Sequence, residues 1–120
     1  MEFFESPAFT RYVADYLHDD SYLALQQLLI RDPERGDLIP GTGGFRKLRW
    51  RDTRRGKGSR GGFRVIYYYL SSDQQIWLMM IYSKGEATDL TPSDKKALRA
   101  AIELESRARK SRRARGGTNG

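Results

Sequence analysis

The chain has 120 residues, which is enough for one domain built around a single hydrophobic core. It contains no cysteine, which excludes disulfides and thiolate chemistry and favours a reducing, cytoplasmic setting. No apolar run approaches the length of a membrane span, and the formal net charge of +7 favours an acidic partner, with nucleic acid first.

The first third of the chain predicts a short strand followed by two helices. Residues 2–5 (EFFE) are short and aromatic, and Ser6 and Pro7 then have the positions of a helix N-cap and a first helical residue. One apolar helix stripe follows: Phe9, Tyr12, Val13, Tyr16 and Leu17. A second helical pattern covers residues 22–31 and ends before Pro33. The short polar turn between them predicts a helical hairpin lying on one face of the domain.

The middle of the chain predicts three strands, at residues 45–51, 63–70 and 75–82. In the first of these, Leu48 and Trp50 alternate with three cations, Lys47, Arg49 and Arg51. That period of two predicts one buried face and one solvated, cationic face. The last two strands are joined as a hairpin, and the glycine-rich residues 37–44 before the first strand are predicted as a loop.

The last third predicts one helix and a tail. Thr91 and Pro92 form a helix start, with Thr91 as N-cap. From Arg107 onward no apolar residue larger than alanine occurs, so we expect a domain at residues 1–105 and a basic, disordered tail at residues 106–120. The order is β-α-α-β-β-β-α, an α+β fold with an antiparallel sheet, a helical hairpin on one face and a C-terminal helix.

Most cations of the core of the chain fall between residues 41 and 70, where Asp52 is the one acid. Eight of the nine are Lys47, Arg49, Arg51, Arg54, Arg55, Lys57, Arg60 and Arg64. Cations separated by glycines, beside tyrosines, suit a phosphate backbone with bases stacked next to it. The stretch therefore predicts an RNA-handling surface.

Three segments, in this order and spacing, resemble the HigB-type toxins of the RelE/ParE superfamily: GTGGFRKLRW, KGSRGGFRVIYYYL and IWLMMIYSKGEATDLT. The resemblance covers roughly residues 3–103, and the family fold is β-α-α-β-β-β-α. It implies a ribosome-dependent endoribonuclease that cuts translated mRNA in the ribosomal A site. The implied partners are the ribosome, mRNA and an inactivating HigA-like antitoxin with a helix-turn-helix domain.

The resemblance also implies the site. It places the family's basic pair on Lys47 and Arg49, its third-strand arginine on Arg64, and its basic residue after the fourth strand on Lys84, with Tyr82 two positions before. RelE has a tyrosine at the start of the last helix, where this chain has Thr91. That role then falls to Tyr82, to a tyrosine among residues 67–69, or to a lysine. The loop cations are expected to contact RNA or the ribosome: Arg51, Arg54, Arg55, Lys57 and Arg60.

Cleavage of RNA by its own 2′-hydroxyl needs a proton acceptor, a group that offsets charge on the phosphorane, and a proton donor for the leaving oxygen. The one histidine, His18, lies in the helical hairpin, which leaves Lys, Arg and Tyr. A lysine among other cations gives up its proton more readily, which favours Lys47, while Arg49 and Arg64 suit phosphate clamping. The scattered acids predict no metal site and no cofactor, hence a metal-independent endoribonuclease.

Two other functions remain open. The ParE branch of the superfamily inhibits DNA gyrase on the same fold, although the joint presence of Lys47, Arg49, Arg64 and Lys84 argues against it. A non-catalytic RNA- or ribosome-binding module is the second alternative, because the tyrosine of the last helix is missing.

Overall fold

The computed structural model describes residues 1–50, 62–83 and 90–118, with side chains up to residue 113 in the last range. The chain divides into two compact units. One contains Met1–Ile39 and Phe45–Asp89, and the other contains Pro40–Gly44 and Leu90–Gly120. The sheet and the first two helices belong to the first unit, and the last helix belongs to the second.

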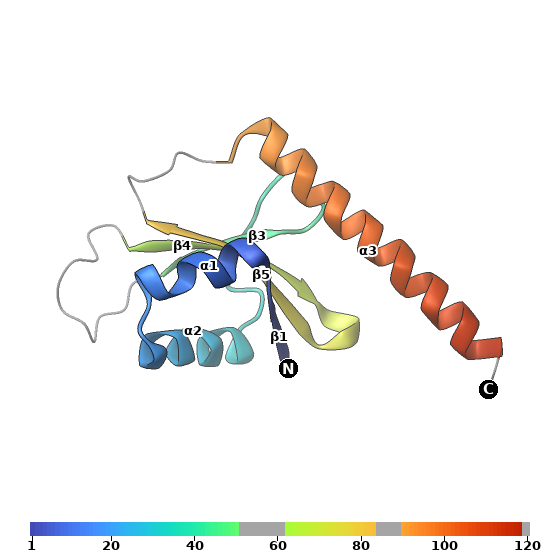
Figure 1. The fold of residues 1–120 in the computed structure, drawn as a ribbon, viewed down its shortest axis with the longest axis horizontal. Helices are drawn as coiled ribbons and strands as arrows, with labels where there is room; N and C mark the ends of the chain where they lie inside the picture. The colour runs from blue at the N-terminus through green and yellow to red at the C-terminus, as the bar shows by residue number, and fades with distance from the viewer. Residues whose placement is uncertain (51–61, 84–89, 119–120) are drawn as a thin grey trace. The chain divides into compact units, whose positions relative to one another are not determined.

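The first unit is built on a five-stranded sheet in the order β1-β5-β4-β3-β2 (Figure 1). Its strands, in chain order, are β1 (Glu2–Glu5), β2 (Asp37–Leu38), β3 (Arg46–Trp50), β4 (Phe63–Leu70) and β5 (Gln75–Ser83). The predicted strands are confirmed within a residue or two of their bounds. The short η2 turn (Ser71–Asp73) joins β4 to β5 as the predicted hairpin.

The sheet is mixed rather than wholly antiparallel, since β1 runs parallel to β5 while the other neighbours are antiparallel. Parallel neighbours need a long connection. Here the whole segment between β1 and β5 in the chain supplies it. The second difference is β2, which falls in a segment predicted as a loop. Asp37 and Leu38 are both exposed, and two residues are too few to show an alternation of apolar and polar side chains. The sequence therefore does not reveal that they pair with β3.

Helices α1 (Pro7–Tyr16) and α2 (Asp19–Arg31) form the predicted hairpin. The Ser6 hydroxyl accepts from the Phe9 N–H at 3.0 Å and donates to the Met79 carbonyl at 2.6 Å, so one side chain caps α1 and ties it to β5. Helix α2 begins three residues before the predicted start, because Asp19 and Asp20 occupy its first turn, where acids favour the helix dipole.

The hairpin covers one face of the sheet. Its apolar side chains join a core cluster with alternate residues of the central strands, and the members include Phe9, Leu25, Leu29, Leu48, Val65, Tyr67 and Ile81. Tyr12, which the sequence pattern places in the apolar stripe, is instead exposed.

The second unit contains α3 (Pro92–Thr118). The predicted cap is confirmed: the Asp94 N–H donates to Thr91 Oγ1 and the Thr91 N–H donates to Asp94 Oδ2, each at 3.0 Å. The helix continues through residues 106–118, where the sequence predicts a disordered tail. Glu105 accepts from Arg109 at 3.0 Å and from Arg112 at 3.2 Å, and such pairs along the helix surface support its last turns.

Candidate nucleic-acid interface

Three predicted site residues form a row across the three central strands. Arg49 on β3 is the register partner of Arg64 on β4, and Arg64 is the register partner of Tyr82 on β5. Directly opposed residues of antiparallel strands project from the same face of the sheet, with Cα atoms about 4.5–5.5 Å apart. The row therefore brings two guanidinium groups and a phenol together on one face.

The neighbouring row identifies that face. Leu48, Val65 and Ile81 are also register partners, one residue along each strand, and all three belong to the core cluster under the helical hairpin. Because successive side chains of a strand point to opposite faces, the row of Arg49, Arg64 and Tyr82 lies on the face away from α1 and α2. The predicted division into a buried and a cationic face is confirmed for β3.

The three side chains differ in exposure. Arg49 is exposed, Arg64 is half-buried, and Tyr82 is only 8% exposed. A ligand arriving from solvent would meet the two guanidinium groups before the phenol. Arginine keeps its charge and can fork onto two oxygens, so this pair is suited to a phosphate.

Lys47 shares the face of Arg49, two residues earlier on β3. Its register partners are Ile66 on β4 and Asp37 on the short strand β2. From the sequence, only cations are expected around Lys47, because Asp37 falls in a predicted loop. The structure places a carboxylate-bearing residue directly across from it.

The remaining predicted site residues lie outside the described residues. They are Lys84, Arg51, Arg54, Arg55, Lys57 and Arg60. Four of the five predicted catalytic residues are thus described, and all four lie on the same sheet face: Lys47, Arg49, Arg64 and Tyr82.

The tyrosines of β4 divide between the two faces. Tyr67 and Tyr69 lie with the core, whereas Tyr68 shares the face of Arg64 and packs between Phe45 and Trp77, with ring centroids 5.1 and 6.5 Å away. Tyr67 is fully buried. Its hydroxyl donates to the Pro33 carbonyl at 2.8 Å and accepts from the Gly36 N–H at 2.9 Å, and burial raises the pKa of this phenol. Tyr67 therefore has a structural role.

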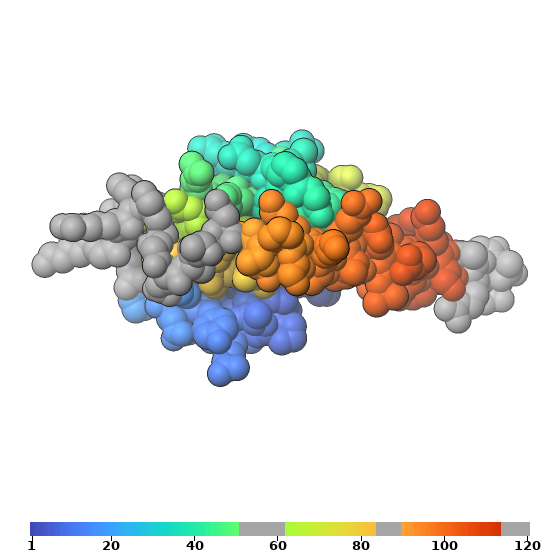
Figure 2. Space-filling view, turned by 90° about the horizontal axis from the view of Figure 1, so that it is seen from above, coloured from blue at the N-terminus to red at the C-terminus, as the bar shows by residue number. Residues whose placement is uncertain are grey.

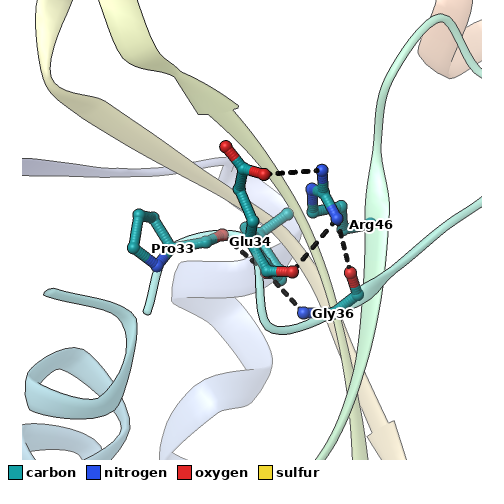
Figure 3. A network of polar contacts seen from close by, with 5 residues as sticks. Pro33, Glu34, Gly36 and Arg46 are labelled. Atoms are coloured by element: carbon teal, nitrogen blue, oxygen red, sulfur yellow. Dashed lines mark hydrogen bonds and ion pairs between the residues drawn. The ribbon is translucent and has the colours of Figure 1, made fainter. Parts of the chain in front are cut away.

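A cation that the sequence analysis did not single out, Arg46, holds the segment after α2 (Figure 3). Its Nη1 donates to the carbonyls of Glu34 at 3.1 Å and Gly36 at 2.8 Å, and its Nη2 lies 3.7 Å from Glu34 Oε2. Alternation along β3 puts Arg46 on the apolar face with Leu48. A cation there needs polar partners, and that sequence pattern could have indicated this structural role.

Among the described residues, no group of three or more His, Asp or Glu side chains is arranged to hold a metal ion. In the same part of the chain, no helix is long and apolar enough to cross a membrane.

The structure thus defines an α+β protein with a helical hairpin on one sheet face and a row of arginines on the other. No protein-family model matches the chain. Among solved structures, the chain is similar to a double arginine-to-alanine mutant of the E. coli toxin RelE in the free state. The TM-score is 0.48 at 13% sequence identity, over 72% of this chain and 85% of that one. This likeness does not identify an activity.

Proposed function

We propose that this protein is a RelE-like toxin of the HigB type from a type II toxin–antitoxin system, which inhibits translation by cutting translated mRNA in the ribosomal A site. The observation that carries the proposal is the register of Arg49, Arg64 and Tyr82 across β3, β4 and β5. These positions match the family's site residues in the sequence resemblance, and the sheet gathers them on one face.

The chemistry proposed is attack of the 2′-oxygen of one nucleotide on its own 3′-phosphorus. The bond from phosphorus to the 5′-oxygen of the next nucleotide breaks, which leaves a 2′,3′-cyclic phosphate and a 5′-hydroxyl. Arg64, with Arg49 beside it, binds the phosphate and offsets the charge that grows on its oxygens. Lys47 accepts the 2′-hydroxyl proton, and Lys84 or Tyr82 gives a proton to the leaving oxygen. No metal ion or cofactor takes part in this scheme.

The ribosome is the proposed source of much of the rate, because a site without histidine depends strongly on how the substrate is positioned. The other proposed partner is a HigA-like antitoxin with a helix-turn-helix domain, and the setting is the cytoplasm. The loop cations Arg51, Arg54, Arg55, Lys57 and Arg60 are proposed to contact mRNA or ribosomal RNA.

Primer extension on a translated mRNA, with and without ribosomes, tests the proposal. We expect cuts within codons that require ribosomes, and a loss of about a hundredfold to a thousandfold in cleavage for Arg64→Ala, as for removal of a group that stabilises transition-state charge. The matched control is Arg35→Ala, an exposed arginine after α2 whose carboxylate partner Asp32 is 3.9 Å away. It should cut like wild type.

Three outcomes would contradict the proposal. Naked RNA cut as fast as ribosome-bound mRNA would remove the ribosome from the mechanism. Ribosome binding without cuts would favour the binding-module alternative. Inhibition of gyrase supercoiling without cuts would favour the ParE-like alternative.

A further inference from the structure

The C-terminal part of α3 differs in chemistry from the part before it. The buried apolar side chains of α3 are Leu98 and Ile102, both in its first half. Residues 106–118 contain no acid and no apolar residue larger than alanine, yet the helix continues through them. They contain six cations, Arg107, Arg109, Lys110, Arg112, Arg113 and Arg115. A cationic extension of this kind needs an explanation other than core packing.

The described cations leave no apolar face on this segment. At 3.6 residues per turn, or about 100° per residue, the five cations of residues 107–113 leave one uncharged sector of about 140°, between Arg107 and Arg112. That sector holds Ala108 and Ser111. A helix that packs on a protein core, or lies on a membrane surface, has an apolar stripe opposite its charges. Residues 106–113 therefore lack the stripe of large apolar side chains that a protein core or a membrane surface would require. Figure 2 shows its surface up to residue 113 in orange and red.

Residues 106–118 carry six cations and no acid. Glu105 accepts from Arg109 and from Arg112, so one carboxylate serves two guanidinium groups. Arg107, Lys110 and Arg113 are exposed, and like charges three or four residues apart on a helix repel each other. An anionic partner that contacts several sides of the helix would relieve that repulsion.

We propose that residues 107–113 of α3 form a second RNA contact, in addition to the residues of the sheet face, which binds the phosphates of a folded RNA with bulges or loops. Four of the five cations in residues 107–113 are arginines, which fork onto phosphate oxygens and stack on exposed bases, and arginine-rich segments are an established mode of RNA recognition. An acidic protein surface would contact one side of the helix. A bulged RNA groove presents phosphates to two sides of it. The choice of RNA over DNA rests on the proposed function.

The test is binding of the full chain to a fluorescent RNA hairpin that contains a bulge, measured over a range of salt concentrations. The variant is the triple substitution Arg107→Gln, Lys110→Gln and Arg113→Gln, because glutamine keeps good helix propensity. The matched control removes the same charge from the first half of the same helix: Lys95→Gln, Lys96→Gln and Arg99→Gln. Circular dichroism confirms that both triple variants keep their helix.

We expect wild type to bind the hairpin with a steep salt dependence. In the 107/110/113 variant the slope of log K against log salt should fall by about two to three, close to one per phosphate contact removed. The affinity of this variant for the hairpin should fall at least tenfold. The affinity of the control variant should stay within about twofold of wild type, because salt screens exposed charges that are far from the bound RNA. Equal losses in the two triple variants would reduce the effect to net charge and overturn the proposal.

Competitors decide the partner. A DNA hairpin of the same sequence, poly-glutamate or anionic phospholipid vesicles that displace the RNA at equal charge concentration would each overturn the assignment to RNA. Arg64→Ala separates this proposal from the first one. It should lose mRNA cleavage, while in the Arg64→Ala background the 107/110/113 substitutions should still weaken hairpin binding more than the control substitutions do. A protein that shows this difference but never cuts mRNA would contradict the nuclease proposal and leave the α3 contact standing.

Discussion

Arg49 and Arg64 lie directly opposite each other on β3 and β4, so the fold places two guanidinium groups at one point of a sheet face. Like charges in this position destabilise a sheet, by about 0.2–1 kcal/mol relative to neutral pairs. A protein selected for stability alone would gain from replacing either one. The proposed phosphate site would use this juxtaposition, because an anion bound there would offset the repulsion between the two charges.

The first prediction follows from that repulsion. Arg49→Gln should leave stability unchanged or raise it by up to about 1 kcal/mol, because it removes one of two opposed charges. Cleavage of ribosome-bound mRNA should nevertheless fall at least tenfold. Urea unfolding and primer extension measure the two effects on the same preparation. A variant that loses stability together with activity would show that Arg49 has a structural role instead.

The second prediction concerns the nucleophile. An mRNA with a single 2′-deoxynucleotide immediately before the cut position should not be cleaved there, because it lacks the hydroxyl that attacks phosphorus. The matched control carries the 2′-deoxynucleotide immediately after the cut and should be cut normally. Products with a 5′-phosphate, or cleavage of the first substrate, would indicate attack by water and rule out the proposed chemistry.

The third prediction concerns the buried phenol of Tyr67. Tyr67→Phe removes the acceptor of the Gly36 N–H and the donor to the Pro33 carbonyl. Leaving a buried N–H without a partner costs about 1–3 kcal/mol, so the urea midpoint should fall accordingly. Tyr69→Phe is the control, because its hydroxyl has an exposed 3.5 Å contact with Gln74. Equal stability of the two variants would contradict the role assigned to Tyr67.

The fourth prediction concerns the start of α3. Thr91→Ala removes the side-chain acceptor of the Asp94 N–H and should cost about 0.5–2 kcal/mol, whereas Thr91→Ser should restore most of it. Far-ultraviolet circular dichroism during urea unfolding follows the helix directly. Failure of serine to rescue the alanine variant would mean that the threonine methyl group, not the cap, matters.

The fifth prediction is a loss of stability in alkali. Burial, and then a hydrogen bond from the Tyr22 hydroxyl to Glu5, raise the pKa of Tyr22 above its usual value of 10.0, and burial also raises that of Tyr67. The folded state keeps these protons at a pH where the unfolded state loses them. Their contribution is therefore complete below pH 10 and declines as pH rises above it.

Urea unfolding at pH 9 and pH 11 measures this decline. Tyr22→Phe should be less stable than wild type at pH 9 but should lose less stability between the two pH values. A wild-type protein with the same stability at both would contradict the prediction.

Local sequence patterns predicted most of the fold. Ser6-Pro7 and Thr91-Pro92 specify helix starts through side-chain caps, which depend on residues only three positions away. The aromatic and β-branched residues of β4 are the types enriched in strands. The parallel pairing of β1 and the short strand β2 depend instead on partners far along the chain, and no local pattern encodes them.

The site shows the same division. Alternation along β3 alone puts Lys47 and Arg49 on one face, whereas the alignment of Arg49, Arg64 and Tyr82 depends on strand register. Register is set by the lengths of connecting segments and by packing, including the shift at Ile66 and Tyr67 between β4 and β5. Helix α3 continues past residue 105, where composition alone argues for disorder, and Glu105 makes two ion pairs there that composition does not reveal.

The parallel edge strand also sets an order of events during synthesis. Glu2 pairs with Gln75, and the Ser6 hydroxyl reaches the Met79 carbonyl, a partner 73 residues away. Of the strands in this sheet, β1 is made before the others yet can pair only once β5 exists, and its pairing costs the entropy of closing a loop of that length. Until β5 has been made, the amino-terminal segment has no strand to join. The other four strands pair with their neighbours in chain order, so β1 alone has to wait for a distant partner.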